Sequence, residues 1–465
     1  MKKFLCILFF SLPVVVSAQF NLYKDSPLDY AWKYVGNAGF SAGVAYGISF
    51  AFSPSNNQPY VAYQDREFIA ENATVMMFNG TNWVNVGNAG FSTDFPENIS
   101  LAFSPSESFP YVAYSDLVGS GLKATVMMFN GTNWMNVGNA GFSAGEADCI
   151  SLAFSPSNNQ PYVAYEDYGN SQKATVMTFN GTDWVNVGNA GFSAGETEYE
   201  SLAFNPSNNQ PYVAFEDEGN SGKATVMRFN GINWVNVGNA GFSAGRAWYI
   251  SLAFSPWNDQ PYVAYADWGN LLKATVMMFN GTDWVDVGNA GFSAGYVYSE
   301  SLAFHPPDGE PYVAFSDASG FATVMKYNGT NWVYVGNEGF SAGVVYSPSL
   351  AFSPIDNQPY VAYEDATSGF AMVMKYDSVM VGINELLKST LSLYPNPATD
   401  KITVELSGIT QGGNITIVDI EGQELITRHI TEPKTQIDIS SLPSGVYFVQ
   451  LTGERTVEVG KIIKE

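Results

Sequence analysis

Cysteine is scarce in this chain of 465 residues, which has only two. Cys6 lies inside an N-terminal apolar run, Phe4–Val16, that follows two lysines and ends in small residues before Gln19. This pattern is typical of a secretory signal peptide, so we predict that residues 1–18 are removed and that the mature protein begins near Gln19. Cys149 is then the one remaining cysteine, and a single cysteine excludes an internal disulfide.

Basic residues are also few, because 20 Lys and Arg stand against 44 Asp and Glu, giving a formal charge of −24. Nucleic-acid binding depends on clustered Lys and Arg, so this balance argues against a nucleic-acid partner. The acidic excess is typical of a polar, self-repelling surface, with cation binding as the alternative. Long apolar runs are missing after residue 16, where none approaches the ~18 residues of a membrane helix. We therefore predict an exported protein with no membrane span.

What the chain has in abundance is internal repetition. The stretch WVNVGNAGFS begins at Trp83 and recurs unchanged at Trp184 and Trp234. Close variants of it begin at Trp32, Trp134, Trp284 and Trp332. The seven tryptophans are spaced by 51, 51, 50, 50, 50 and 48 residues. A period of this length is typical of a four-stranded blade of a β-propeller.

One repeat, residues 151–195, reads SLAFSPSNNQPYVAYEDYGNSQKATVMTFNGTDWVNVGNAGFSAG. Turn residues divide it into four apolar runs of strand length, SLAF, PYVAY, ATVMTF and DWVNV, and Asn180-Gly181 is a hairpin signal. In the two middle runs, residues at odd and at even positions are both apolar, as expected for a sheet that is covered on both faces. No segment shows helical spacing or helical length.

The strand count predicts how the ring closes. Each strand type occurs seven times, yet the first Trp strand precedes any SLAF strand, and the last repeat ends at Tyr376 without a Trp strand. Seven complete blades exist only if the strand Trp32–Gly36 joins the sheet formed by residues 349–376. We therefore predict an all-β fold in which residues 19–376 form a seven-bladed β-propeller closed by its N-terminal strand. The glycine that ends each Trp strand, such as Gly36, should supply the backbone angles of the crossing to the next blade.

A different sequence style follows a predicted linker at residues 377–390. Residues 391–465 alternate short strands with Gly and Pro turns, which predicts a small β-sandwich. Three motifs stand out there, Tyr394-Pro395-Asn396-Pro397-Ala398, Leu442-Pro443-Ser444-Gly445-Val446-Tyr447 and Lys461-Ile462-Ile463-Lys464.

On these motifs the tail closely resembles the C-terminal sorting domain of the type IX (Por) secretion system of Bacteroidetes. The resemblance implies that the type IX machinery is a partner, and that the chain passes through the periplasm and across the outer membrane. It also implies removal of the tail, which leaves the propeller secreted or tethered to surface lipopolysaccharide. It does not say what the propeller does.

The loops on the two faces of the predicted propeller differ. One face carries nearly constant loops, SPSNNQP and NGTNW. The other face, here called the variable face, carries the connection from each Trp strand to the next SLAF strand and the loop after each YVA strand. Its loops differ from copy to copy, as in TDFPENI, ETEYE and RAWYI. We interpret the constant loops as scaffold and the variable face as a recognition surface.

Aromatic and charged residues gather in the variable loops, from which we predict a binding site for a glycan or a surface protein. Flat rings stack on sugar faces, carboxylates accept hydrogen bonds from hydroxyls, and protein interfaces use similar rings. The predicted ligand-binding residues are Tyr46, Tyr168, Tyr199, Glu200, Arg246, Trp248, Tyr249, Trp268, Tyr298, Glu300 and Tyr346. The alternative is that the rings only cover loop backbone.

An aspartate follows the YVA strand in every repeat. The seven are Asp65, Asp116, Asp167, Asp217, Asp267, Asp317 and Asp365. Seven carboxylates would suit a cation with oxygen ligands. We favour a scaffold role, because Asp at a turn caps backbone N–H groups and a feature of every blade is typical of scaffold.

Catalytic residues should break the sevenfold pattern, and Glu200 and Glu300 do so where four blades have Ile and the seventh has Pro348. Two carboxylates at the channel mouth would form the acid/base pair of a glycan-cleaving enzyme if they were roughly 5–10 Å apart. We favour instead an ion pair between Glu200 and Arg246, with Glu300 solvated. There is no Ser-His-Asp set, zinc-ligand spacing or phosphate loop, and His305 is interpreted as a turn residue. We therefore predict a non-catalytic binding protein without a cofactor, with the glycan-cleaving enzyme as the alternative.

Overall fold

The computed structural model describes residues 29–379 and 391–465, apart from 68–69, 94, 107–108, 120, 407–412, 421, 431, 433 and 453–456. The predicted signal peptide and most of the predicted linker lie outside the described residues. A compact unit, Asp29–Ser378, is separate from the C-terminal unit, and each is described by itself. No helix in the described part of the chain is long and apolar enough to cross a membrane.

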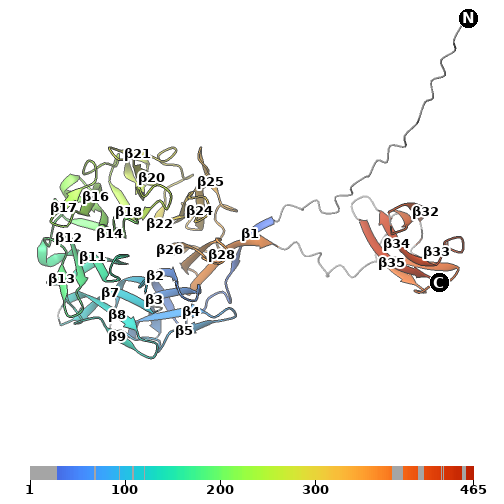
Figure 1. Ribbon diagram of the computed structural model, residues 1–465, viewed down its shortest axis with the longest axis horizontal. Helices are drawn as coiled ribbons and strands as arrows, with labels where there is room; N and C mark the ends of the chain where they lie inside the picture. Colours follow the sequence, from blue (N-terminus) through green and yellow to red (C-terminus); the bar gives the residue numbers. More distant parts are fainter. Residues whose placement is uncertain are drawn as a thin grey trace, which may run out of the picture. The chain divides into compact units, whose positions relative to one another are not determined.

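The unit Asp29–Ser378 is a ring of seven four-stranded antiparallel sheets (Figure 1). Each innermost strand lies beside the innermost strand of the next sheet, and β26 (Val345–Phe352) returns to β2 (Val44–Phe52). The ring is therefore closed, and the predicted seven-bladed propeller is confirmed.

The blades are numbered along the chain, with the innermost strand first. Blade 1 consists of β2, β3 (Pro59–Glu67), β4 (Ala70–Phe78) and β5 (Trp83–Asn85). Blade 2 consists of β6 (Glu97–Phe103), β7 (Pro110–Val118), β8 (Gly121–Phe129) and β9 (Trp134–Asn136). Blade 3 consists of β10 (Ala147–Phe154), β11 (Pro161–Asp167), β12 (Lys173–Phe179) and β13 (Trp184–Asn186). Blade 4 consists of β14 (Thr197–Phe204), β15 (Pro211–Asp217), β16 (Lys223–Phe229) and β17 (Trp234–Asn236). Blade 5 consists of β18 (Ala247–Phe254), β19 (Pro261–Asp267), β20 (Lys273–Phe279) and β21 (Trp284–Asp286). Blade 6 consists of β22 (Tyr298–Phe304), β23 (Pro311–Ser316), β24 (Ala322–Tyr327) and β25 (Trp332–Tyr334). Blade 7 consists of β26, β27 (Pro359–Asp365), β28 (Ala371–Val379) and β1 (Asp29–Tyr34). Single 3-10 turns follow the second strand of blades 3, 4 and 5, namely η1 (Tyr168–Asn170), η2 (Glu218–Asn220) and η3 (Trp268–Asn270).

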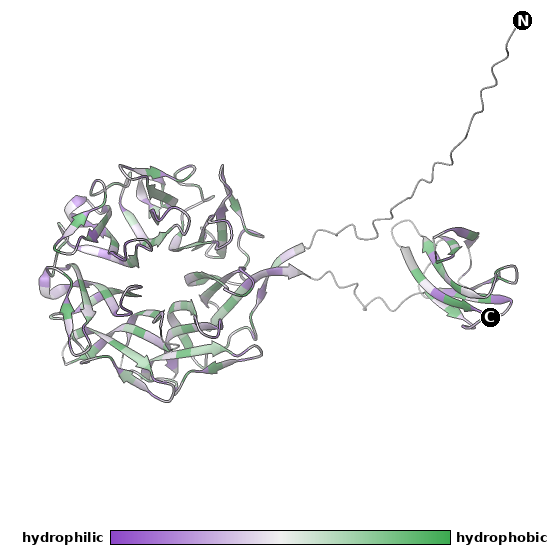
Figure 2. Cartoon of the chain, in the orientation of Figure 1, coloured by the Kyte–Doolittle hydropathy of each residue, from purple (hydrophilic) through white to green (hydrophobic). Residues whose placement is uncertain are grey.

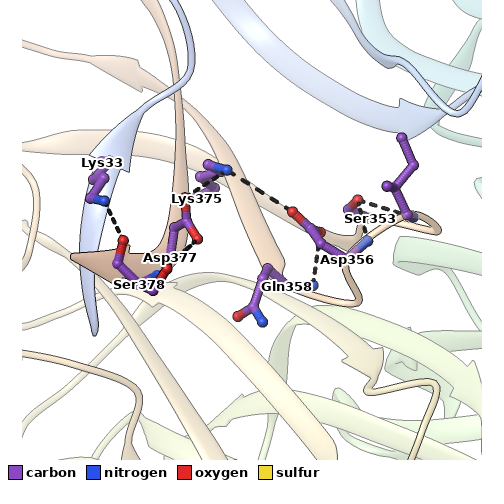
Figure 3. A network of polar contacts seen from close by, with 8 residues as sticks. Lys33, Ser353, Asp356, Gln358, Lys375, Asp377 and Ser378 are labelled. Atoms are coloured by element: carbon purple, nitrogen blue, oxygen red, sulfur yellow. Dashed lines mark hydrogen bonds and ion pairs between the residues drawn. The ribbon is translucent and has the colours of Figure 1, made fainter. Parts of the chain in front are cut away.

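The N-terminal strand β1 closes blade 7 by pairing with β28, as the strand count predicts. Beyond the backbone pairing, Lys33 Nζ donates a 2.5 Å hydrogen bond to the carbonyl oxygen of Ser378. Lys375 lies 2.8 Å from Asp377 and 4.0 Å from Asp356, so a polar network ties the seam together (Figure 3). The closing strand begins three residues before Trp32, which is the first tryptophan of the repeat.

The recurring ten residues connect each blade to the next. In all seven copies the indole N–H of the Trp donates to the carbonyl oxygen of the Val that lies three residues after the Trp of the preceding copy, at 2.7–2.8 Å. Each Trp ring also stacks on the Phe of that preceding copy, with centroids 3.9–4.3 Å apart. Trp184, for example, donates to Val137 and stacks on Phe142. The motif therefore recurs because every copy binds its neighbour.

Glycine is required at the crossing, as predicted. The seven glycines that end the Trp strands have φ between 71° and 78°, a region that favours Gly. At Gly138 a Cβ would also lie only 2.9 Å from a ring carbon of Phe179. Both the backbone angle and the close ring therefore exclude a larger residue.

The middle strands are buried on both faces, as the sequence indicates. Every residue of β15 and of β19 is buried between neighbouring blades. Hydrophobic colouring lies within the strands of the ring in Figure 2. The innermost strands carry a further link that the sequence analysis missed, in which a serine accepts a hydrogen bond from the next blade. Ser201 Oγ, for example, accepts from the N–H of Leu252 at 2.9 Å.

The C-terminal unit is a small two-sheet sandwich, as predicted. Its strands are β29 (Leu391–Tyr394), β30 (Lys401–Leu406), β31 (Gly413–Val418), β32 (Glu424–Ile430), β33 (Lys434–Asp438), β34 (Gly445–Thr452) and β35 (Val457–Lys464). One sheet has the order β29-β30-β33 and the other β32-β31-β34-β35. Buried side chains from both sheets, including Ile402, Ile437, Ile415 and Val449, form one core.

The motifs of the tail contact one another. Asn396 of the first motif donates to the carbonyl oxygen of Lys461 at 2.8 Å and accepts from the N–H of Ile463 at 2.9 Å. In the second motif the Tyr447 hydroxyl donates to the carbonyl oxygen of Pro443 at 2.7 Å. The opening motif is thus held to the terminal strand, and the second motif closes its own turn.

Candidate functional site

The innermost strand of every blade contains a β-bulge near the ring axis. In blade 3, Asp148 pairs with Glu166 and Ser151 with Ala164, so two residues, Cys149 and Ile150, lie opposite one. The first bulge residue has a left-handed φ of 49° to 61° in all seven blades: Gly47, Asn98, Cys149, Tyr199, Tyr249, Ser299 and Ser347. Gly and Asn adopt this region readily, whereas a Tyr held there is strained, and such strain gathers at functional sites.

The bulges surround a central cavity of about 460 Å³, here called the hub cavity. Its wall includes the second bulge residue of each blade: Ile48, Ile99, Ile150, Glu200, Ile250, Glu300 and Pro348. The wall is therefore asymmetric, since blades 7, 1, 2 and 3 present apolar side chains, while blades 4 and 6 present carboxyl groups on either side of Ile250.

Both carboxyl groups of the hub cavity are buried. Glu200 accepts a short hydrogen bond from the Thr197 hydroxyl through Oε1, whereas its Oε2 has no partner among the described residues. Glu300 is 8% exposed, and neither of its carboxyl oxygens has a side-chain or backbone partner elsewhere in the described chain. Burial raises the pKa of Glu200 to about 8 and that of Glu300 well above its usual range.

The expected ion pair between Glu200 and Arg246 is wrong. Arg246 instead lies 2.6 Å from Glu216 and 2.6 Å from Glu218. The reason is local, because Arg246 belongs to the connection into blade 5 and lies beside the end of β15, whereas the bulge places Glu200 in the hub wall. The expectation that Glu300 is solvated is wrong for the same reason.

Aromatic rings from blades 4, 5 and 6 form one continuous cluster on the variable face. This cluster, here called the aromatic arc, consists of Tyr199, Trp248, Tyr249, Trp268, Tyr296 and Tyr298. Tyr249 lies at its centre, with its ring centroid 5.1 Å from that of Tyr199 and 6.2 Å from those of Trp248 and Tyr298. The arc continues from Trp248 to Trp268 at 5.1 Å and from Tyr298 to Tyr296 at 5.5 Å. Tyr199 and Tyr249 also line the hub cavity, so the arc lies at its rim.

Local sequence explains why the arc forms in blade 5. Trp248 pairs with Ala266, where the other blades have Gln, Ser or Glu, and the small side chain leaves room for the indole. Trp268 begins the turn η3, which Asp267 caps by accepting from the N–H of Gly269 at 2.8 Å. The two indoles then meet edge to face at 84°.

The structure therefore brings together seven of the predicted site residues and leaves the rest apart. Tyr199, Trp248, Tyr249, Trp268 and Tyr298 join the arc, and Glu200 and Glu300 line the hub cavity beside it. Tyr46 instead lies under the Arg66 guanidinium at 4.2 Å. Tyr168 and Tyr346 are exposed on other blades and have no place in the arc.

Acidic residues lie close to Glu200 where blades 3 and 4 meet, and Glu166 among them is absent from the predicted site residues. Burial raises the pKa of Glu166 to about 7, and the nearby Asp148, Glu198 and Glu196 add to the rise. Glu166 stands just before the recurring aspartate, a position that is also Glu in blades 4 and 7 (Glu216 and Glu364) and is Gln, Ser or Ala in the other four. Because three blades share this Glu, no departure from the repeat in the sequence could have identified Glu166.

Five of the seven recurring aspartates cap the following turn, namely Asp167, Asp217, Asp267, Asp317 and Asp365, while Asp116 accepts from the hydroxyls of Thr93 and Thr125. Asp167 accepts from the N–H of Gly169 and from the Thr175 hydroxyl, both at 2.9 Å. Asp317 accepts from the N–H of Ser319 at 2.8 Å and from the Thr323 hydroxyl at 3.0 Å. Within the described ranges no group of three or more His, Cys, Asp and Glu side chains is arranged to hold a metal ion.

Comparison with known protein families supports the reading of the tail. The family model of the secretion system C-terminal sorting domain matches residues 392–465. The resemblance to the Por sorting domain is thereby confirmed, and it indicates secretion to the outer surface or beyond it. Among curated proteins, none matches the sequence significantly.

Solved structures with a similar fold include three of interest. PorZ, a surface component of the type IX secretion system of Porphyromonas gingivalis, is 12% identical with a TM-score of 0.45, covering 93% of this chain and 61% of its own. A PL25 ulvan lyase is 12% identical with a TM-score of 0.50, covering 73% of this chain and 94% of its own. The SapL1 lectin, solved with α-methyl fucoside, is 17% identical with a TM-score of 0.42, covering 64% of this chain and 96% of its own. This chain thus spans 61% of the length of the PorZ structure. At such identities the likeness concerns the fold alone.

Proposed function

We propose that this protein is a secreted or cell-surface binding protein without catalytic activity, and that it recognises a glycan through the aromatic arc on its variable face. The observation that carries the proposal is the arc itself, in which six rings from three blades form one surface at the rim of the hub cavity. A protein partner on the same surface is the alternative.

The chemistry of the arc suits sugars. Sugar rings present apolar C–H faces that stack on aromatic rings, while their hydroxyl groups donate to carboxylates. The arc offers partly exposed rings, including Trp268 at 49% exposure, and the acidic side chain of Glu198 lies close to Tyr199. Aromatic residues with a polar tip also keep their conformational cost of binding low, because each has only two side-chain torsions.

Glu200 and Glu300 favour a second candidate, a glycan-cleaving enzyme, because both line one cavity. Acid/base cleavage of a glycoside needs one protonated and one ionised carboxyl group at neutral pH. Burial instead raises the pKa of both groups, that of Glu200 to about 8 and that of Glu300 well above its usual range, so burial does not divide them into an acid and a base. The thiol pKa of Cys149 is also raised by burial, which makes it a poor nucleophile. These shifts support binding over catalysis.

A glycan array probed with the full chain tests the proposal. Binding to defined saccharides, with the same saccharides recovered intact by chromatography after long incubation, is the expected result. Shortened products would establish the enzyme instead. A protein that ignores every glycan but binds surface proteins through the arc would overturn the glycan assignment.

A further inference from the structure

The two carboxyl groups of the hub cavity and the aromatic arc lie on the same three blades. Glu200 is in blade 4 and Glu300 in blade 6, and the arc spans blades 4 to 6. The bulge places Tyr199 and Tyr249 beside the hub wall next to these carboxyl groups. The residues of blades 4 to 6 that differ from the other blades therefore bring aromatic rings and carboxyl groups together at the rim of the hub cavity.

Glu300 is an unusual residue for this place. A buried carboxyl group with no partner is destabilising, because folding strips its hydration without replacing it. The scaffold does not need it, since Ile250 occupies the equivalent position in blade 5 and is buried there. A ligand group that bonds to the Glu300 carboxyl group on binding would explain why this residue is kept at a buried position.

Charge indicates which kind of ligand group would supply that partner. Asp148 and Glu166 of blade 3 lie close to Glu200, and Glu198 lies close to Tyr199 at one end of the arc. The nearby cation Arg246 is already paired with Glu216 and Glu218. An acidic sugar would be repelled here, whereas an ammonium group would pair with the carboxyl groups. Ring faces attract ammonium groups as well, through their negative π faces.

We propose that the ligand is an amino sugar whose protonated amine enters the hub cavity and lies against the rings of Tyr199 and Tyr249. Glu300 and Glu200 release any protons that they hold to the solvent and pair with the amine as carboxylates. This inference rests on the proposed function and names its ligand class. A cavity of about 460 Å³ is in the range of small-molecule sites and accepts a whole sugar residue. A lysine side chain, by contrast, would leave most of it empty.

Calorimetry with two matched oligosaccharides provides the test. The full chain is titrated at about pH 7, where amines are still largely protonated and a buried carboxyl group ionises more readily than at lower pH, with a glucosamine tetramer and with its N-acetylated counterpart. We expect the glucosamine tetramer to bind ~10-fold or more tightly than the neutral tetramer, because only the amine pairs with the buried carboxyl groups. A galacturonate tetramer should bind most weakly.

Three variants assign the effect to the hub. Glu300→Gln keeps the shape of the side chain and should remove most of the preference for the amine. Glu300→Ile introduces the residue that blade 5 has at the equivalent position, so we expect this variant to fold. Its melting curve checks that it does. Glu97→Gln removes one exposed charge from the variable face of blade 2 and should leave the preference unchanged.

Several outcomes would overturn the inference. Equal binding of the two tetramers, preference for the galacturonate tetramer, or an equal effect of the substitutions at Glu97 and Glu300 would each do so. Binding of a lysine-rich peptide, but not of the glucosamine tetramer, in a Glu300-dependent manner would also overturn it. Binding of the N-acetylated tetramer alone leaves the proposed glycan recognition intact, whereas failure of every saccharide removes both proposals.

Discussion

The indole Nε1 of Trp32 donates a 2.8 Å hydrogen bond to the carbonyl oxygen of Val335, 303 positions along the chain. The same bond joins every other pair of neighbouring blades, where its partners are only 45 to 48 positions apart. Trp32 also stacks on Phe340, as its equivalents do. The seam of the ring is thus built from the same contacts as its other interfaces.

Deleting residues 19–37 should destabilise the whole ring. The deletion removes β1 and Trp32, so blade 7 loses its outer strand and β28 becomes an exposed sheet edge. A deletion of residues 19–28 keeps β1 and is the matched control. We expect thermal unfolding, followed by circular dichroism, to shift strongly downward for the longer deletion alone. Equal melting temperatures would show that β1 does not close the ring.

Two glycines with similar backbone angles should respond differently to alanine. Gly238 and Gly231 both have positive φ, at 71° and 94°, so each alanine carries backbone strain of about 1–2 kcal/mol. A Cβ at Gly238 would lie 2.9 Å from Phe279 and 3.1 Å from Trp284, whereas a Cβ at Gly231 meets nothing within 4 Å. Gly238→Ala should therefore lose about 1–3 kcal/mol more of the free energy of unfolding, the usual cost of overpacking. Denaturant titration measures the difference, and equal losses would contradict the interlocking of the motif.

Stability should depend on pH through Glu200. Its pKa is raised to about 8 in the folded state, against an ordinary value of about 4.3, so the folded protein holds the proton more tightly than the unfolded chain. The stabilisation linked to this proton is complete below about pH 4 and is lost as the pH rises through about 8. Glu200→Ile has no such proton, so its advantage in the free energy of unfolding should grow between pH 5 and 8, by about 1.4 kcal/mol for each unit of pKa difference at most. A constant difference across this range would contradict the burial of the carboxyl group.

Removing residues 391–465 should change the destination of the protein and not the folding of its ring. The buried core of the tail contains only residues of the tail, and the cores between the blades contain only residues of the ring. Because the sorting-domain match lies within this segment, the shortened chain should accumulate in the periplasm. Cell fractionation with immunoblotting would show this, and undiminished protein in the medium or on the cell surface would contradict it.

The fold could be predicted because its signals are local and repeated. Asn180-Gly181 marks a hairpin by its own chemistry, and counting strand types requires Trp32 to complete blade 7. The capping role of residues such as Asp167 follows equally from local turn chemistry.

The geometry of the site could be predicted only in part, because it depends on register. The bulge shifts the inner strand by one residue, and the residues at its left-handed position have no type in common, as Cys149, Tyr199 and Ser299 show. Of the seven, only Gly47 and Asn98 are of types that favour the left-handed conformation and so could indicate the bulge. Without the bulge, Glu200 cannot be placed in the hub wall, which is why its pairing with Arg246 was mispredicted.

The most direct test of the account is the affinity of an arc variant for the saccharides selected on the array. Trp248→Ala with Tyr249→Ala removes two central rings, and Asn158→Ala with Gln160→Ala removes two hydrogen-bonded side chains from a constant loop. Aromatic contacts contribute about 1 kcal/mol or more each beyond buried area, so losing both rings should weaken binding by at least about tenfold, and up to a hundredfold. The account predicts this loss for the arc variant and unchanged affinity for the loop variant, both folded by melting curve. Retained affinity in the arc variant, or a loss confined to the loop variant, would contradict it.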